Sequence, residues 1–134
     1  MRRIIIASHG LFSAGLKNTL EFIAGVNDVI DINAYMDADI KLEDQVIDIF
    51  SSFKSNDEVL VMTDILQGSV NQAFQPYLND KVFLVTGINV PCALELCLMP
   101  GPLTKDSIRD TIQNARKTIL FVNDYEISFD ENDE

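Results

Sequence analysis

The amino-acid sequence has few of the residues on which many small proteins depend. Its 134 residues include two cysteines, one histidine and no tryptophan, and 10 basic residues stand against 21 acidic ones. Cys92 and Cys97 match neither a CxxC motif nor a zinc-binding spacing, so we expect two reduced, buried thiols. The formal net charge of −11 argues against binding to nucleic acid or to an anionic membrane, because both need basic patches.

Long hydrophobic runs are also absent. The apolar start of the chain stops at Ser8-His9-Gly10, which does not fit a signal peptide. The sequence contains no run of about 18 apolar residues that would span a membrane. We therefore expect a cytoplasmic protein with no direct membrane insertion.

Apolar residues are nevertheless plentiful, at 47% of the chain, and they suffice for the core of one compact domain. Residues 124–134 differ from the rest, because they hold six of the acidic residues and no basic residue. We therefore predict one folded domain over residues 1–123 and a solvated acidic tail over residues 124–134.

Strand and helix patterns alternate along the chain. Short apolar runs rich in β-branched residues predict strands at residues 4–7, 29–32, 59–62 and 82–85. Segments with apolar residues at helical spacing lie between these runs and after the last one. The alternation predicts a single doubly wound α/β domain, with a mainly parallel four-stranded sheet in the order 2-1-3-4 and helices on both faces.

Several residues are typical of helix ends. Asp39 is the expected N-cap of the second helix, and Ser69-Val70-Asn71-Gln72 matches a capping box that opens the third. Pro76 is expected to end or kink that third helix. Asn89 and Thr104 are the expected N-caps of the last two helices.

Two strand-end loops are expected to meet at one edge of the sheet. Ligands of doubly wound sheets bind at the carboxyl ends of the strands where the winding reverses, here between the first and third strands. The loop after the first strand is Ser8-His9-Gly10-Leu11, and the loop after the third runs from Thr63 to Ser69. The one histidine of the chain and Asp64 therefore fall on adjacent loops.

A histidine beside a carboxylate suits nucleophilic chemistry. A carboxylate that accepts one ring N–H fixes the tautomer and leaves the other nitrogen free to attack, and His9 with Asp64 would form this pair. Gly68-Ser69 leads into a helix N-terminus, which favours an anion such as a phosphoryl group. Gly10 allows close approach of the backbone, and Ser13 is a further candidate hydroxyl donor.

Structural interpretations of the same residues remain open. His9 is also a plausible loop residue, Asp64 a plausible turn residue and Ser69 a plausible N-cap. The sequence has no GxSxG elbow for a hydrolase, and no second histidine or nearby cysteine for a metal centre. We expect no metal and no cofactor, and the residues by themselves favour a phosphohistidine or anion site.

Three motifs, in this order, resemble the IIA component of the bacterial phosphoenolpyruvate-dependent sugar phosphotransferase system, mannose/fructose/sorbose family. The first is Ser8-His9-Gly10 at the end of the first strand. The second is Asp64–Ser69, which is similar to the family's Asp-x-x-Gly-Gly-Ser loop, and the third is the Gly-x-Asn-x-Pro loop Gly87–Pro91. The resemblance extends over about residues 2–117.

This resemblance implies a phosphoryl carrier. His9 would accept a phosphoryl group on Nε2 from the phosphocarrier HPr, while Asp64 holds the Nδ1–H group. Ser69, Gly68 and Gly10 would surround the phosphoryl group. His9 would then pass it to a IIB component, which phosphorylates the incoming sugar; the sugar itself is not encoded in a IIA sequence.

The resemblance also implies a homodimer that exchanges an antiparallel edge strand. Residues 119–122 are a candidate for this strand, although their periodicity does not separate a strand from a continuing helix. Two positions depart from the family pattern, since Gln67 replaces the first glycine of the loop and Val70 replaces a common proline. A side chain at position 67 would lie beside the path of the phosphoryl group.

Three alternatives stay open, and the last two come from other classes of protein. The phosphotransfer subunit of a dihydroxyacetone kinase shares the fold and the strand-end histidine, although the loops Gln67–Ser69 and Gly87–Pro91 favour the sugar-transport branch. A non-catalytic regulator that senses the state of the phosphotransferase system is the second alternative. The third is a flavodoxin-like binder of small molecules, but only Phe12 provides an aromatic ring near the strand-end loops.

Overall fold

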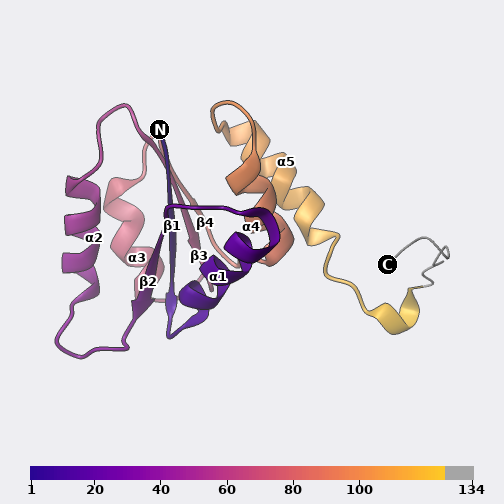
Figure 1. Cartoon of the computed structure of the whole chain (residues 1–134), viewed down its shortest axis with the longest axis horizontal. Helices are drawn as coiled ribbons and strands as arrows, with labels where there is room; N and C mark the ends of the chain where they lie inside the picture. Colours follow the sequence, from indigo (N-terminus) through magenta and orange to yellow (C-terminus); the bar gives the residue numbers. More distant parts are fainter. Residues whose placement is uncertain (126–134) are drawn as a thin grey trace.

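The structure, a computed structural model, describes residues 1–125 and contains one four-stranded sheet (Figure 1). All neighbouring strands are parallel, and their order is β2-β1-β3-β4, as the sequence predicts. Every predicted strand lies within an observed one. The strands are β1 (Arg2–His9), β2 (Val29–Ala34), β3 (Glu58–Thr63) and β4 (Val82–Val85).

Helices cover both faces of this sheet, which confirms the doubly wound α/β fold (Figure 1). Two of them, α2 and α3, lie on one face, and α1, α4 and α5 lie on the other. The helices are α1 (Phe12–Ala24), α2 (Leu42–Ser51), α3 (Ser69–Phe74), α4 (Val90–Leu98) and α5 (Lys105–Arg116). Short 3-10 turns follow at η1 (Gln75–Tyr77) and η2 (Val122–Asp124).

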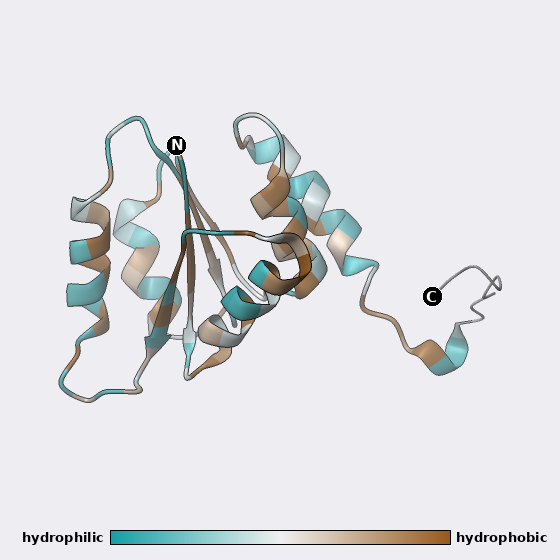
Figure 2. Ribbon diagram, viewed as in Figure 1, coloured by the Kyte–Doolittle hydropathy of each residue, from teal (hydrophilic) through white to brown (hydrophobic). Residues whose placement is uncertain are grey.

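The central strand β1 supplies both hydrophobic cores. Ile6 packs into the core under α1, α4 and α5, whereas its neighbour Ile5 packs into the core under α2 and α3. Successive residues of a strand point to opposite faces, so these two neighbours enter different cores, and both are fully buried because helices cover both faces. This arrangement explains why the strand is a continuous apolar run rather than an alternating one, as Figure 2 shows for the interior of the sheet.

Three of the predicted helix ends are confirmed. The Asn89 side chain accepts a hydrogen bond from the backbone amide of Cys92 at 3.0 Å, so Asn89 is the N-cap of α4. Thr104 and Ser107 form a reciprocal capping box at the start of α5. Helix α3 ends at Phe74, immediately before the 3-10 turn that contains Pro76.

Two of the predicted caps are wrong. The N-cap of α2 is Lys41 rather than Asp39, which lies in the preceding turn. At the start of α3 the N-cap is Gly68, so Ser69 is the first helical residue and forms no capping box. The helix begins after Gly68 because the chain turns there with a φ of 143°, a backbone conformation that glycine adopts readily and serine does not.

The chain beyond α5 does not join the sheet within the described residues. Helix α5 ends at Arg116, and residues 119–121 lead away from the body of the domain to η2 (Figure 1). Ile119 and Phe121 are 76% and 66% exposed. The predicted exchange of an edge strand in a dimer therefore stays a prediction. The predicted acidic tail, residues 124–134, lies outside the described residues apart from its first two positions, so the domain boundary at residue 123 stays a prediction as well.

Other expectations concern the thiols and the membrane. Both cysteines are free, with Cys92 buried and Cys97 half-buried, and burial raises the pKa of the Cys97 thiol to about 11. Over residues 1–125, no helix combines the length and the apolar character needed to cross a bilayer.

Candidate functional site

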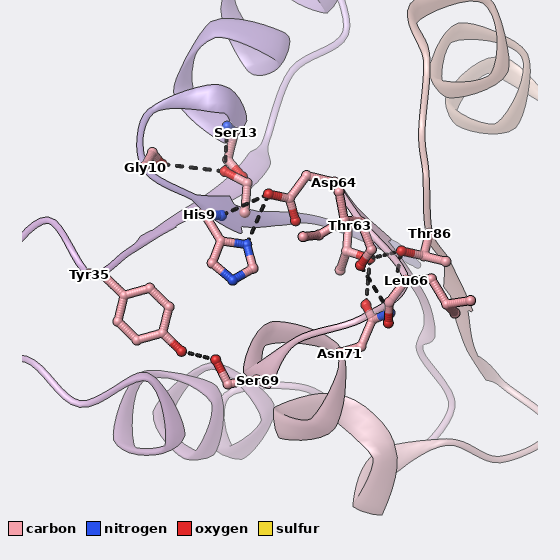
Figure 3. Close-up of polar contacts among 12 residues, drawn as sticks. His9, Gly10, Ser13, Tyr35, Thr63, Asp64, Leu66, Ser69, Asn71 and Thr86 are labelled. Carbon is pink, nitrogen blue, oxygen red and sulfur yellow. Dashed lines mark hydrogen bonds and ion pairs between the residues drawn. The ribbon is translucent and has the colours of Figure 1, made fainter.

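His9 and Asp64 meet at the carboxyl edge of the sheet, as their places after β1 and β3 predict (Figure 3). Nδ1 of His9 lies 3.0 Å from Oδ2 of Asp64, and the backbone amide of His9 donates to the same oxygen at 3.0 Å. Burial acts to raise the pKa of Asp64, but the two hydrogen bonds from His9, together with those from the backbone of Ile65 and of Asp64 itself, hold the pKa below its usual range. The carboxylate is therefore ionised at neutral pH and suited to accept the Nδ1–H group.

The ring nitrogen of His9 that does not contact Asp64 is Nε2. Because Nδ1 faces Asp64, the other ring nitrogen points into the space bordered by Tyr35 and Ser69 (Figure 3). The His9 side chain is 38% exposed and that of Asp64 is 16% exposed. The imidazole is thus anchored on its inner side and accessible on its outer side, which suits a nucleophile that must meet another macromolecule.

A buried pair of serines shapes the turn after β1. The hydroxyl of Ser8 accepts hydrogen bonds from the backbone amide and the hydroxyl of Ser13, at 2.8 and 2.7 Å. Gly10 completes the turn with a φ of 63°, and its amide donates to the carbonyl of Ala34 at 3.1 Å. Ser13 is fully buried, so its hydroxyl does not reach the site, contrary to the sequence-based suggestion.

The loop after β3 is held from beneath by a buried amide. The Asn71 side chain donates to the carbonyls of Ile65 and Leu66, at 3.3 and 2.8 Å. Its Oδ1 accepts a hydrogen bond from Thr63 at 2.5 Å, and its amide nitrogen lies 3.3 Å from the hydroxyl of Thr86 (Figure 3). These contacts link the loop that carries Asp64 to the adjacent ends of β3 and β4.

Gly68 brings this loop against the imidazole. A Cβ at this position would lie 3.3 Å from Nε2 of His9 and 3.2 Å from Cε1, which is a tight contact. The φ of 143° also disfavours any residue that has a side chain. Gln67 does not have a positive φ, so the departure from the family's glycine pair introduces no backbone strain. Ser69, which follows, makes a hydrogen bond through its hydroxyl to the hydroxyl of Tyr35.

Sequence reasoning missed two residues of this site. Tyr35 follows β2 directly, and its ring centroid lies 5.6 Å from that of His9. The signal was its place at the carboxyl end of a strand next to β1. Asn71 lies three positions before the fully buried Phe74, on the inner face of α3. A polar side chain on the buried face of a helix indicates a structural hydrogen-bond network, because buried polar groups need partners.

Exposed apolar side chains follow the strands whose ends carry the site. They lie on the loops that follow β1, β2 and β3 or, for one of them, at the start of α1. We call this group the apolar rim: Leu11, Phe12, Tyr35, Met36, Ile40, Ile65 and Leu66. A surface cavity of about 590 Å³ lies elsewhere, at the opposite edge of the sheet beside Arg2 and Glu58. Those two side chains pair at 2.6 Å, and Arg2 also donates to backbone carbonyls, so they serve the fold.

Comparison with known proteins agrees with this geometry. The family model described as EIIA-man, PTS system fructose IIA component, matches residues 3–115. A solved structure described as a phosphoenolpyruvate-dependent sugar phosphotransferase system permease from Klebsiella pneumoniae subsp. pneumoniae is 34% identical, with a TM-score of 0.84 and coverage of 91% of each chain.

Two further solved structures are similar. A PTS IIA protein associated with the fucose utilization operon of Streptococcus pneumoniae is 28% identical, with a TM-score of 0.76 and coverage of 92% of this chain and 94% of that one. A mannose/sorbose specific IIA subunit from Enterococcus faecalis is 18% identical, with a TM-score of 0.72 and coverage of 97% of each, a likeness of fold alone. The chain therefore belongs to the mannose/fructose/sorbose family of IIA components and is a phosphotransfer component of a sugar phosphotransferase system.

Proposed function

We propose that this protein is a phosphoryl carrier that accepts a phosphoryl group from phospho-HPr on Nε2 of His9 and passes it to a IIB component. The observation that carries the proposal is the 3.0 Å contact between Nδ1 of His9 and Asp64, which leaves Nε2 as the available nucleophile. Family membership supports it, since the matched family consists of IIA components of this transport system.

The transfer needs little covalent chemistry from the protein. The lone pair of His9 Nε2 attacks the phosphorus of the donor's phosphohistidine, the new N–P bond forms, and the electron pair of the old N–P bond returns to the donor imidazole. The ring of His9 gains positive charge in this step, and the ionised carboxylate of Asp64 at Nδ1 stabilises it. In the second transfer, a nitrogen of a IIB imidazole attacks the phosphorus on His9, and the electron pair of the broken N–P bond returns to Nε2 of His9.

Three residues are proposed to hold the phosphoryl group. The Ser69 hydroxyl is a hydrogen-bond donor for its oxygens, and Gly68 leaves room beside Nε2 that a side chain would fill. Gly10 contributes by turning the backbone in a left-handed conformation beside His9. Its amide does not bind the phosphoryl group directly, because it already donates a hydrogen bond to the carbonyl of Ala34. None of these interactions requires a metal or a cofactor.

Partner proteins are the expected ligands of the surrounding surface. HPr and IIB must each bring a histidine to His9, and the apolar rim gives both of them a surface to bury around it. The proposal also includes a homodimer, in which residues 119–122 exchange between subunits. The reaction would take place in the cytoplasm.

A labelling experiment tests the proposed function. The protein is incubated with enzyme I, HPr and phosphoenolpyruvate that carries radioactive phosphorus, and the label on the intact chain is measured. We expect an acid-labile, base-stable label on the wild type and none on His9→Ala. Absence of label on the wild type, or label that survives His9→Ala, would contradict the proposal.

A second step separates a carrier from a regulator. The labelled protein is purified away from enzyme I and HPr and mixed with the IIB component of a mannose-family system. A carrier passes the label onward within the mixing time, whereas a regulator that only senses the phosphorylation state retains it. Retention of the label with every IIB partner offered would refute the onward transfer.

A further inference from the structure

Tyr35 occupies an unusual position beside the reactive imidazole. It follows β2, whose last residue, Ala34, is paired with His9 in the sheet. The backbone φ of Tyr35 is 68°, in the left-handed region that non-glycine residues rarely adopt. Its side chain is directed over the site rather than into the core, and the residue is 61% exposed. Packing in the core therefore does not explain its conformation.

The polar end of Tyr35 is aimed at the site. Its hydroxyl makes a hydrogen bond with the hydroxyl of Ser69, across the space that Nε2 of His9 faces (Figure 3). The ring itself lies beside the imidazole, with the ring centroids 5.6 Å apart and the planes tilted by 32°. The Tyr35 hydroxyl thus comes from the loop after β2 and the Ser69 hydroxyl from the first residue of α3, and the two converge where a group bound to Nε2 would lie.

Two neutral hydroxyls are a good partner for a phosphoryl group. Each of its oxygens accepts hydrogen bonds, and bonds to such an anion are stronger than the bond between two neutral hydroxyls. An exchange of the Tyr35–Ser69 bond for two bonds to phosphoryl oxygens is therefore favourable once His9 is phosphorylated. The tyrosine ring would also cover one side of the phosphohistidine and reduce the access of water.

We infer that Tyr35 is a phosphoryl-binding residue, whose hydroxyl leaves Ser69 and donates to a phosphoryl oxygen on Nε2 of His9. The phenol stays neutral throughout, so no proton is transferred and only hydrogen bonds are exchanged. This inference rests on the proposed function, because it assigns a contact to the phosphorylated state of His9. It assigns to Tyr35 a role that Ser69 does not fill alone.

The test compares Tyr35→Phe with Tyr125→Phe, which removes a hydroxyl from an exposed tyrosine outside the site. His9 is phosphorylated with phosphoramidate, a chemical donor that needs no partner protein. Phosphorus NMR then follows the second ionisation of the phosphoryl group, which occurs at about pH 6 for such groups. A hydrogen bond to the dianion lowers its pKa, so we expect a higher phosphoryl pKa in Tyr35→Phe than in the wild type and no change in Tyr125→Phe.

A second measurement gives the size of the effect. In an equilibrium with phospho-HPr, we expect Tyr35→Phe to lower the equilibrium constant for phosphoryl transfer to His9 by about fivefold. The loss of one partly exposed hydrogen bond to an anion implies an effect of this size. An unchanged or lowered phosphoryl pKa in Tyr35→Phe would overturn the inference. Failure of phospho-HPr to label the wild type refutes the proposed function instead, and the chemically phosphorylated protein keeps the two failures apart.

Discussion

At the scale of single residues, the account depends on the contact between Asp64 and the imidazole. Asp64→Asn removes the negative charge beside Nδ1 and permits an amide N–H to face that nitrogen, which favours the tautomer with a protonated Nε2. We expect transfer from phospho-HPr to slow by about 10- to 100-fold while the fold is retained. The rate of labelling in rapid-quench experiments measures this, with circular dichroism as the check on the fold.

The matched control for that variant is Asp106→Asn. Asp106 is an exposed carboxylate on α5 whose contact with Arg109 lies outside the site. It should transfer at the wild-type rate. If Asp64→Asn does so as well, Asp64 is only a turn residue and the tautomer argument is wrong.

At the scale of elements, the sequence predicts most of the fold because the signals for its strands are local. The run at residues 4–7 is apolar at every position since β1 is buried on both faces, and the alternation with helices then implies a parallel sheet. The same reasoning places His9 and Asp64 on adjacent loops. It needs only the order of the strands and the rule for ligand sites in such sheets.

What sequence reasoning missed depends on backbone angles and on long-range contacts. The left-handed conformation of Tyr35 has no local signal, because non-glycine residues rarely adopt it, and its bond to Ser69 joins positions 34 residues apart. Ser69 matches a capping pattern, yet Gly68 takes the N-cap position and the serine hydroxyl turns to Tyr35. Local propensity therefore described the elements well and the polar contacts between loops poorly.

The link between α3 and the loop before it gives a prediction at this scale. Asn71→Asp replaces an amide that donates to two loop carbonyls with a buried carboxylate that repels them. We expect the free energy of unfolding to fall by about 3 kcal/mol, and the amides of residues 65–68 to exchange faster with solvent. Urea unfolding and hydrogen exchange measure the two effects.

Gln72→Glu is the control for the charge. It makes the same change from amide to carboxylate one position further along α3, where the side chain is exposed. Its free energy of unfolding should stay within about 0.5 kcal/mol of the wild type. Equal losses in the two variants would show that helix propensity or net charge, rather than the buried hydrogen bonds of Asn71, determines the result.

At the scale of the whole molecule, the exposed apolar segment after α5 predicts a homodimer. Ile119, Leu120, Phe121 and Val122 are at least half exposed, which is costly for four successive apolar residues in water. We expect the full chain to be dimeric in light scattering coupled to gel filtration. The double variant Ile119→Asp, Phe121→Asp should shift it to the monomer.

A single aspartate elsewhere controls for added charge. Ile47 on α2 is 53% exposed and lies on the other side of the sheet, so Ile47→Asp should leave the dimer intact. A monomeric wild type at micromolar concentration would refute the exchange of residues 119–122. A dimer that survives the double variant would place the interface elsewhere.

The most direct test of the central claim is the position of the phosphoryl group on the imidazole. Phosphorylated protein labelled with nitrogen-15 in its histidine is prepared with enzyme I, HPr and phosphoenolpyruvate, and the coupling between phosphorus and each ring nitrogen is measured by NMR. The contact of Nδ1 with Asp64 predicts phosphorus bonded to Nε2 of His9 and a proton retained on Nδ1. Phosphorus bonded to Nδ1, or to any residue other than His9, would contradict it.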